Sequence, residues 1–434
     1  MEFRRKPRLT PREISLLSLI GFVAVIVISV LVGVNIGLSR SVGGGGGFYS
    51  PWEGARMFLF SHVNPYNLDV ALQSQQLAYA QAASASQNPY DLTVPFFLLP
   101  LYFPFAFISD TLFALFPSRF VVDPTVVRGL WMFLNEGALL GTAFLVLRLI
   151  EWSPRRIFLA AFFLLGIFSF YSISALLDGA PVILLGLLYM GILYALQTEQ
   201  DELAGALLVL AFFRWEVGLL FFIYVVWRVY YEKRSRVFYG FGMLMFILLI
   251  ASFLMNPGWV IPFLQSCLTD LRAAYGFTSS AVLFRFWPSF DPRLTWIIPV
   301  GLLLLLGFEW YASRGRDSRH FIWTACLTLA VTPLIGLRTE LVNLVVLFPA
   351  LALIFVTVVE RWRYGYGVAG LLYLIVLLFP WGFLIRSVIF QSQFYLDLLY
   401  LFYPLFTLLG LYWTRWWFIR PPRTWLEAVR ASRA

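Results

Sequence analysis

The chain has 434 residues, of which 60% are hydrophobic, 19% are aromatic and only 13% are charged, and its mean hydropathy is +0.80. Soluble globular proteins carry about a quarter charged residues, so this chain has too little polar surface to enclose its apolar side chains in water. The composition therefore excludes a soluble enzyme, a disordered protein and a disulfide scaffold, and it indicates an all-α, polytopic membrane protein.

The net charge of +9 does not indicate a nucleic-acid-binding protein, because the basic residues form short clusters between apolar runs. Such clusters orient helices in a bilayer. Two cysteines, Cys267 and Cys326, are too few for a disulfide framework, and two histidines, His62 and His320, are too few for a zinc cage. We expect no cofactor and no metal site, with a divalent cation left open.

Apolar runs of roughly 20 residues, the length needed to cross a bilayer, recur along the chain. The first run lacks the small-residue cleavage pattern of a signal peptide, so it is predicted to be a span. A further stretch, 203–229, is interrupted by Arg214-Trp215-Glu216 and is predicted to form two helices that meet at a break. Counting that pair, we expect about twelve transmembrane helices, the other ten lying near residues 15–38, 125–149, 157–177, 181–197, 238–255, 296–311, 321–335, 341–359, 367–385 and 395–418.

Residues 94–116 are also apolar, but they contain Pro95, Pro100 and Pro104 and end near Asp110. Each proline removes a helical hydrogen bond, and an aspartate within a lipid-facing span costs about 2.5–3.5 kcal/mol. We therefore expect an interfacial or re-entrant segment, although the charge pattern alone barely distinguishes this from a span.

With this topology, 22 of the 32 basic residues lie on the cytoplasmic side, including both termini. The long loops 39–124 and 256–295 then lie on the extracytoplasmic side of the plasma (inner) membrane. The first begins with a glycine run at 43–47, which predicts a flexible tether. Residues 52–61 and 263–275 are predicted to form interfacial helices, and Asn64-Pro65-Tyr66 and Asn88-Pro89-Tyr90 are predicted to form turns.

Charged residues at the predicted membrane edges are the candidates for chemistry, because no nucleotide-binding loop, metal motif or serine-hydrolase turn is present. For each there is also a structural explanation. Glu53 and Arg56 lie one helical turn apart, as a functional pair or a solvated surface pair. Asp178 either acts in the site or caps the following helix. Arg214 and Glu216 are either functional or a structural pair at the break. Asp270 and Arg272 are expected to face solvent, and the alternative is that they contact substrate.

The order of several short motifs resembles the multi-spanning GT-C glycosyltransferases. The likeness covers roughly residues 15–275 and is greatest to glycosyltransferase family 87 (also called DUF2029), a bacterial group related to polyprenyl-phosphomannose-dependent mannosyltransferases. The matching residues are Gly47-Phe48, Ala55-Arg56, Asn64-Pro65-Tyr66, the aromatic segment 94–107, Asp178-Gly179-Ala180, Arg214-Trp215-Glu216 and Pro257-Gly258-Trp259.

Three positions depart from the family pattern. Gly47 stands where the family has a loop carboxylate, the general base. Ala180 replaces a glutamine, and only the positive charge of the family's Lys-Pro-Gln break is kept, as Arg214. Either Glu53 substitutes for the missing base, or the protein has lost or changed its activity.

The resemblance implies an integral membrane enzyme that transfers a hexose, such as mannose, from a polyprenyl-phosphate sugar to an extracytoplasmic lipid or glycan acceptor, with inversion. In this interpretation Glu53 and Asp178 are catalytic, and the donor is bound by Arg56, Tyr66, Arg214, Glu216, Trp259 and Arg272.

The predicted organisation is a cytoplasmic N-terminus (1–14), a GT-C-like catalytic module (15–275), C-terminal transmembrane helices (276–418) and a basic cytoplasmic tail (419–434). The expected partners are the lipid-linked donor, the acceptor and membrane lipids, and no nucleic acid. The alternatives are a catalytically degenerate GT-C-fold protein and a lipid-linked-sugar flippase or transporter. The long outer loops and the lack of repeated spans favour an enzyme over a transporter.

Overall fold

The computed structural model describes residues 11–79, 92–108, 123–272, 276–289 and 294–419. Nearly all of this part of the chain is helical, and its one β-type contact is an isolated antiparallel bridge between Phe277 and Thr339. The expectation of an all-α protein is confirmed.

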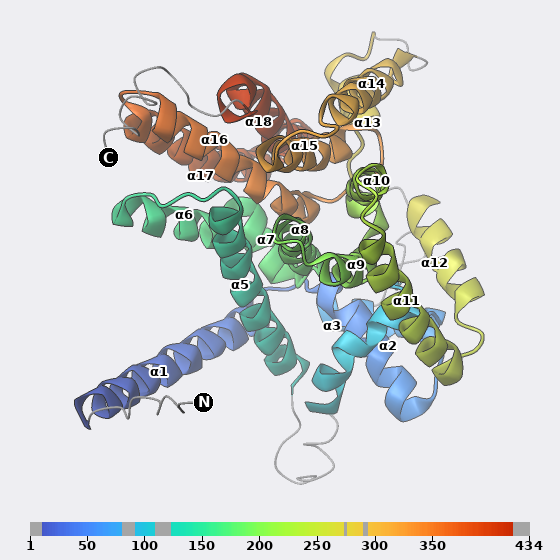
Figure 1. The fold of residues 1–434 in the computed structure, drawn as a ribbon. Helices are drawn as coiled ribbons and strands as arrows, with labels where there is room; N and C mark the ends of the chain where they lie inside the picture. Colours follow the sequence, from blue (N-terminus) through green and yellow to red (C-terminus); the bar gives the residue numbers. More distant parts are fainter. Residues whose placement is uncertain (1–10, 80–91, 109–122, 273–275, 290–293, 420–434) are drawn as a thin grey trace, which may run out of the picture.

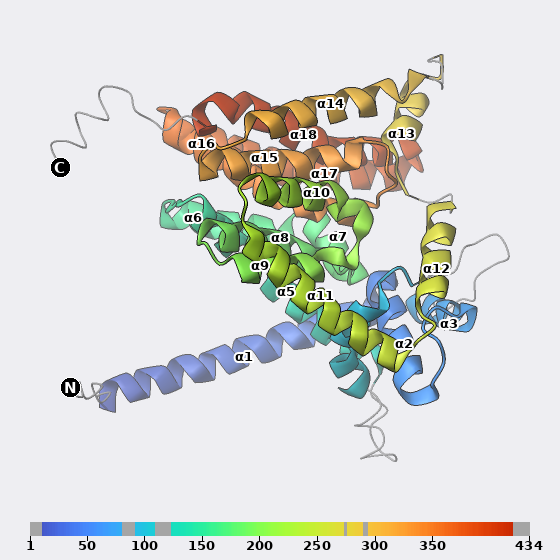
Figure 2. The same cartoon turned by 45° about the vertical axis from the view of Figure 1, so that its right-hand side comes forward.

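The helices form three groups that keep the same order in both views (Figures 1 and 2). On one side lie α1 (Pro11–Ser41), which extends away from the body, and α2 (Gly46–Ser61), α3 (Leu68–Tyr79) and η1 (Phe96–Tyr102). The middle group contains α5 (Pro124–Leu149), α6 (Arg156–Phe168), α7 (Phe170–Asp178), α8 (Val182–Gln197), α9 (Asp201–Leu210), η2 (Ala211–Phe213), α10 (Trp215–Tyr231) and α11 (Ser235–Met255).

The third group lies on the opposite side of the middle helices from α1 (Figure 2). Before it, α12 (Val260–Arg272) runs along the outside of the molecule near α3 and α11 (Figure 1). The third group comprises α13 (Ser279–Phe286), α14 (Ile297–Ala312), α15 (Ser318–Val331), η4 (Thr332–Leu334), η5 (Leu341–Leu347), α16 (Phe348–Arg361), α17 (Gly365–Phe390) and α18 (Gln393–Ile419).

Six helices in the described residues are long and apolar enough to cross a membrane, or seven if α6 and α7, bent by 44°, form one span. Several of them bury little of their apolar surface within the protein: the buried share is 6% in α1, 11% in α11 and 17% in α17. Apolar surfaces of this extent are not stable in water, so these helices face lipid. The chain is a membrane-embedded protein, and the larger number of twelve spans stays a prediction.

The helix ends in the middle group follow from local sequence. Asp123 accepts a hydrogen bond from the Thr125 amide at 3.0 Å and Pro124 occupies the first turn, so α5 begins there. Ser169 caps α7 at the bend after α6. Gly179, with φ +68°, ends α7 in a left-handed conformation that favours glycine. As predicted, α9 and α10 meet at a break at Arg214, whose backbone is extended.

The prediction of a flexible tether is wrong, because residues 42–45, here called the glycine turn, form a short link from α1 to α2, and Gly46 and Gly47 lie in the first turn of α2. Gly44 and Gly45 have φ of +100° and +94°, and α2 begins at Gly46 rather than at residue 52. A Cβ on Gly45 would lie 2.7 Å from Nε of Arg128. The glycines are therefore required by backbone conformation and close packing. The first half of α2 is buried in the protein, which differs from the interfacial position expected for this helix.

Two other expectations about the loops are tested in part. The Asn64-Pro65-Tyr66 turn is present, with Asn64 Oδ1 accepting from the Tyr66 amide at 3.1 Å, whereas Asn88-Pro89-Tyr90 lies outside the described residues. The proline-rich segment begins as η1, whose Phe96 and Leu99 are fully buried, and residues 109–122, with Asp110, lie outside the described residues.

The predicted orientation can be tested at two exposed positions on different elements. In a variant with Cys267 and Cys326 replaced by alanine, Gln265→Cys on α12 should react with a membrane-impermeant maleimide added to intact cells. Ser235→Cys at the start of α11 should react only after permeabilisation, because basic clusters remain in the cytoplasm. The opposite labelling pattern would reverse the predicted topology.

Candidate functional site

Two Arg-x-Glu segments, each interrupting an apolar run, meet at one end of the middle group. Arg214-Trp215-Glu216 joins η2 to α10, and Arg338-Thr339-Glu340 joins η4 to η5. Nη1 of Arg214 lies 3.2 Å from Oε1 of Glu216 and 3.8 Å from Oε1 of Glu340. The guanidinium therefore lies between two carboxylates from segments far apart in the sequence.

The end of α12 is attached to the second of these segments. Arg338 forms an ion pair with Oδ1 of Asp270 at 3.1 Å and also donates to the Asp270 carbonyl. Phe277, shortly after α12, forms the β-bridge with Thr339. Asp270 was expected to face solvent, but its side chain is only 29% exposed because this ion pair holds it against the 338–340 segment.

Asp178 lies against the first turn of α2. Its Oδ1 accepts a hydrogen bond from the Gly47 amide at 3.3 Å. A Cβ on Gly47 would collide with Oδ2 of Asp178 and would lie 2.9 Å from Cα of Ala180. The carboxylate of Asp178 therefore lies where a side chain at position 47 would project. The structure shows no capping of α8 by Asp178, because Pro181 is the N-cap residue and α8 has no side-chain cap.

The link that carries Asp178 is held by two buried side chains of α5. Arg128, 1% exposed, donates to the carbonyls of Ser39 at 3.3 Å, Val42 at 3.1 Å and Leu177. Nε1 of Trp131 donates to the Gly179 carbonyl at 2.9 Å. The end of α1, the glycine turn and the end of α7 are thus fixed to one helix.

Asp178 and Arg214 line one hollow, here called the polar cavity, which is partly open to solvent and has a volume of about 60 Å³. Gly47, Val94 and Pro181 contribute to its wall, and Asp270 and Glu340 to its charge. A smaller hollow that also contains Arg214, Asp270 and Glu340 continues it toward Arg338 and Glu216.

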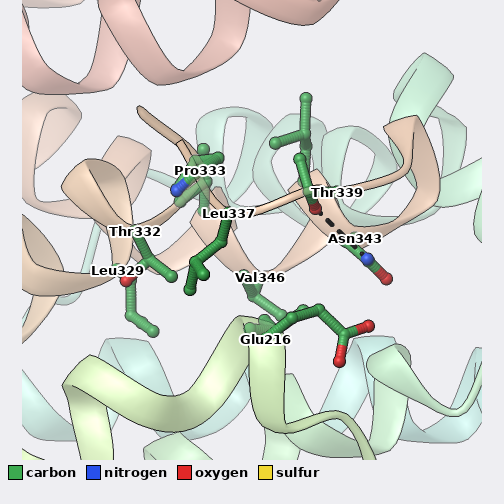
Figure 3. A pocket seen from close by; sticks show the side chains of 11 residues that line it. Glu216, Leu329, Thr332, Pro333, Leu337, Thr339, Asn343 and Val346 are labelled. Atoms are coloured by element: carbon green, nitrogen blue, oxygen red, sulfur yellow. Dashed lines mark hydrogen bonds between the residues drawn. The ribbon is translucent and has the colours of Figure 1, made fainter. Parts of the chain in front are cut away.

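Beyond that hollow, Glu216 also lines a further pocket, shown in Figure 3. There its carboxylate, from α10, lies across from Thr339 and Asn343, which are joined by a 3.2 Å hydrogen bond. The polar surface around Arg214 therefore extends along the 338–343 segment.

A separate apolar hollow, here called the apolar groove, has a volume of about 310 Å³. The two hollows share three wall elements at neighbouring positions. Phe213 lines the groove, and the next residue, Arg214, lines the polar cavity. In the same way, Leu184 of α8 lines the groove and Pro181 at its start lines the cavity, and Phe97 of η1 lines the groove and Val94 just before it lines the cavity. A molecule with a polar head and an apolar chain fits this arrangement.

Of the other sequence-predicted residues, Glu53, Arg56 and Trp259 lie apart from the polar cavity. Glu53 is 1% exposed and accepts from Nη1 of Arg56 at 3.0 and 3.2 Å, and neither residue lines the cavity. Trp259 is buried among aromatic rings, including Phe96 and Phe263. Arg272 ends α12, and its side chain lies outside the described part of the structure.

Tyr66 does not line the polar cavity but holds the backbone of one of its wall residues, Val94. Its hydroxyl donates to the carbonyl of Val94 at 2.9 Å, which fixes one wall residue. Burial raises the pKa of Tyr66, so its hydroxyl keeps its proton for this hydrogen bond.

Burial and the carboxylates of Asp270 and Glu216 raise the pKa of Cys267 to about 12, so this thiol is neutral at physiological pH.

Sequence reasoning missed Arg338 and Glu340 and counted Arg128 only as a topological charge. A signal for the first two is present, because Arg338-Thr339-Glu340 repeats the Arg-x-Glu pattern of the break at Arg214 between two apolar runs. Among the described residues, no group of three or more His, Cys, Asp or Glu side chains is arranged to hold a metal ion.

No family model matches the chain, and no curated protein or solved structure shows significant similarity to it.

The close approach of Asp178 to Gly47 predicts that Gly47→Ala destabilises the protein. Alanine favours helices, so its intrinsic effect in α2 is favourable, and the collision should outweigh it by about 1–3 kcal/mol. Thermal unfolding in detergent measures this. Gly137→Ala in α5, with no atom within 4 Å of the added Cβ, is the matched control and should be slightly stabilising, by up to about 1 kcal/mol. Adding Asp178→Ala to Gly47→Ala should recover part of the loss, and purely additive effects would contradict the contact.

Proposed function

We propose that this protein is a membrane glycosyltransferase that transfers a hexose from a polyprenyl-phosphate sugar to a hydroxyl group of a lipid or glycan acceptor, with inversion. The observation that carries the proposal is that Phe213 lines the apolar groove and the next residue, Arg214, lines the polar cavity. The prenyl chain occupies the groove, the phosphate lies at Arg214, and the sugar lies in the polar cavity. The proposed orientation has both termini in the cytoplasm and the cavity on the extracytoplasmic side of the plasma membrane.

The side chains of the polar cavity match the chemistry of such a donor. Arginine presents a planar fork of donors that suits phosphate oxygens, and Arg214 supplies it at the end of the groove. Carboxylates accept hydrogen bonds from sugar hydroxyls, and Asp270 and Glu340 supply them further in. Ion pairs also stabilise these charges in the empty cavity, because Arg214 lies beside Glu216 and Glu340, and Asp270 pairs with Arg338.

Asp178 is the proposed general base. It is a carboxylate of the polar cavity, and it fills the space beside Gly47, the position at which the resembling family carries its loop carboxylate. Glu53 is a weaker candidate, because it is enclosed in α2 beside Arg56 and does not line the cavity.

In the proposed reaction, Asp178 accepts the proton of the acceptor hydroxyl as its oxygen attacks the anomeric carbon from the face opposite the phosphate. The bond from the anomeric carbon to the phosphate oxygen breaks, and the polyprenyl phosphate leaves with the electron pair. Arg214 stabilises the negative charge that develops on this phosphate. One displacement gives inversion at the anomeric carbon.

The role of Asp178 is tested by Asp178→Asn, which keeps the shape of the side chain but cannot accept the proton. Transfer should fall by about 10²–10⁴-fold, with thermal stability close to wild type. Glu53→Gln, the matched change at the other candidate, should retain transfer. Loss of transfer in Glu53→Gln with full activity in Asp178→Asn would assign the base to Glu53 instead.

The role of Arg214 is tested by donor binding. Arg214→Gln should weaken the binding of polyprenyl phosphate by about 1.5–3 kcal/mol, roughly ten- to hundredfold, because a charge-assisted contact is lost. Glu216→Gln removes the charge of the partner and leaves Arg214 in place with one competing carboxylate fewer, so lipid binding should be kept or become tighter. If both variants lose stability and binding to the same extent, Arg214 has only a structural role.

A further inference from the structure

A second cavity, with a volume of about 540 Å³, lies at the other end of the middle helices. It is formed where α8 ends, α9 begins, α10 ends, α11 begins and the α14–α15 link passes. α10 has 17 residues, so its ends lie about 25 Å apart, and this second cavity is separated from the polar cavity by nearly the thickness of a bilayer's hydrocarbon core. Its charged lining residues are Arg228, Arg234, Arg236, Arg316, Glu199, Asp201 and Glu232.

The inner wall of the second cavity is built around Arg228, which is 5% exposed. Its guanidinium donates to the carbonyls of Ser313 and of Arg316, the latter at 3.0 Å, and pairs with Glu232 at 2.5 Å. These contacts fix the α14–α15 link to the end of α10. They also place the backbone of Arg316 at the cavity.

Arg234 forms the opposite part of the wall. It pairs with Asp201 at the start of α9 and donates to the Leu196 carbonyl at the end of α8, at 3.0 Å. Two of the four arginines and two of the three carboxylates therefore neutralise one another. The others are Arg236, Arg316 and Glu199, for which the described part of the structure contains no ion pair.

The four arginines and three carboxylates give the lining of the second cavity a net charge of +1, and Arg236, Arg316 and Glu199 are exposed. Near it in the sequence, Tyr230 on α10 and Tyr239 on α11 are 75% and 72% exposed, and α11 is a candidate membrane span that is only 11% buried within the protein. Exposed tyrosines mark the level of lipid head groups, and basic pockets between helices at this level bind anionic head groups. Arginine forks suit phosphate oxygens in particular.

We propose that the second cavity binds a phosphate-bearing anion, which Arg236 and Arg316 contact directly while Arg228 and Arg234 hold the walls in place. Two sources share this chemistry: the head group of an anionic phospholipid and a water-soluble phosphate ester. The position at the start of α11, a candidate membrane span with the exposed Tyr239, favours the phospholipid.

The test measures dissociation constants for the full-length protein in a neutral detergent. The probes are dioctanoyl-phosphatidylglycerol, dioctanoyl-phosphatidylcholine and glycerol 3-phosphate. Phosphatidylglycerol should bind more tightly than phosphatidylcholine. Arg236→Gln and Arg316→Gln should each weaken its binding about tenfold, the effect of losing one charge-assisted contact. Arg363→Gln, an exposed arginine in the α16–α17 link outside the second cavity, is the matched control and should leave binding unchanged.

The source of the phosphate follows from the third probe. If glycerol 3-phosphate binds much more weakly than phosphatidylglycerol, the ligand is a lipid, and if the two bind equally and both depend on Arg236, it is a soluble ester. Equal affinities in wild type, Arg236→Gln and Arg316→Gln would overturn the proposal, as would equal binding of phosphatidylcholine. Sugar transfer is not measured, so neither result depends on the proposed enzymatic function.

Discussion

The buried guanidinium of Arg128 connects the parts of the chain on which the polar cavity depends. The last carbonyls of a helix have no partner within it and must find one elsewhere, most of all where lipid excludes water. Arg128 satisfies carbonyls at the end of α1, in the glycine turn and in the last turn of α7. Asp178 follows directly after the last of these. Its position is therefore set by a charge on α5, fifty residues earlier in the chain.

This connection requires an absence of side chains in the glycine turn and in the first turn of α2. A Cβ at Gly45 would meet the Arg128 guanidinium, and one at Gly47 would meet Asp178. A run of glycines usually indicates flexibility, but here it allows an arginine and a carboxylate to approach the backbone closely. The same approach explains how a carboxylate from α7 can lie beside α2, where the resembling family has one on the loop itself.

The sequence predicted the helical class, the break at Arg214 and two residues of the polar cavity, Asp178 and Arg214, because each of these follows from a local interruption of an apolar run. It did not predict that Glu340 lies beside Arg214, or that Glu53 lies outside the polar cavity. Those facts depend on which distant segments pack together, and helical periodicity carries no information about that. For Glu53, an exposed pair with Arg56 and an enclosed one have the same spacing in the sequence.

The ion pairs of Arg214 bear on how a site of this kind works within a membrane. An isolated guanidinium at the bilayer edge is costly, and Glu216 and Glu340 offset that cost in the empty cavity. A phosphate that reaches Arg214 from the groove must compete with these carboxylates, so affinity comes only from the difference between the two sets of contacts. In the proposed reaction the competition has a use. Charge on the phosphate grows as the sugar leaves, so Arg214 binds the departing phosphate more strongly than the incoming donor, which is the condition for stabilising the transition state.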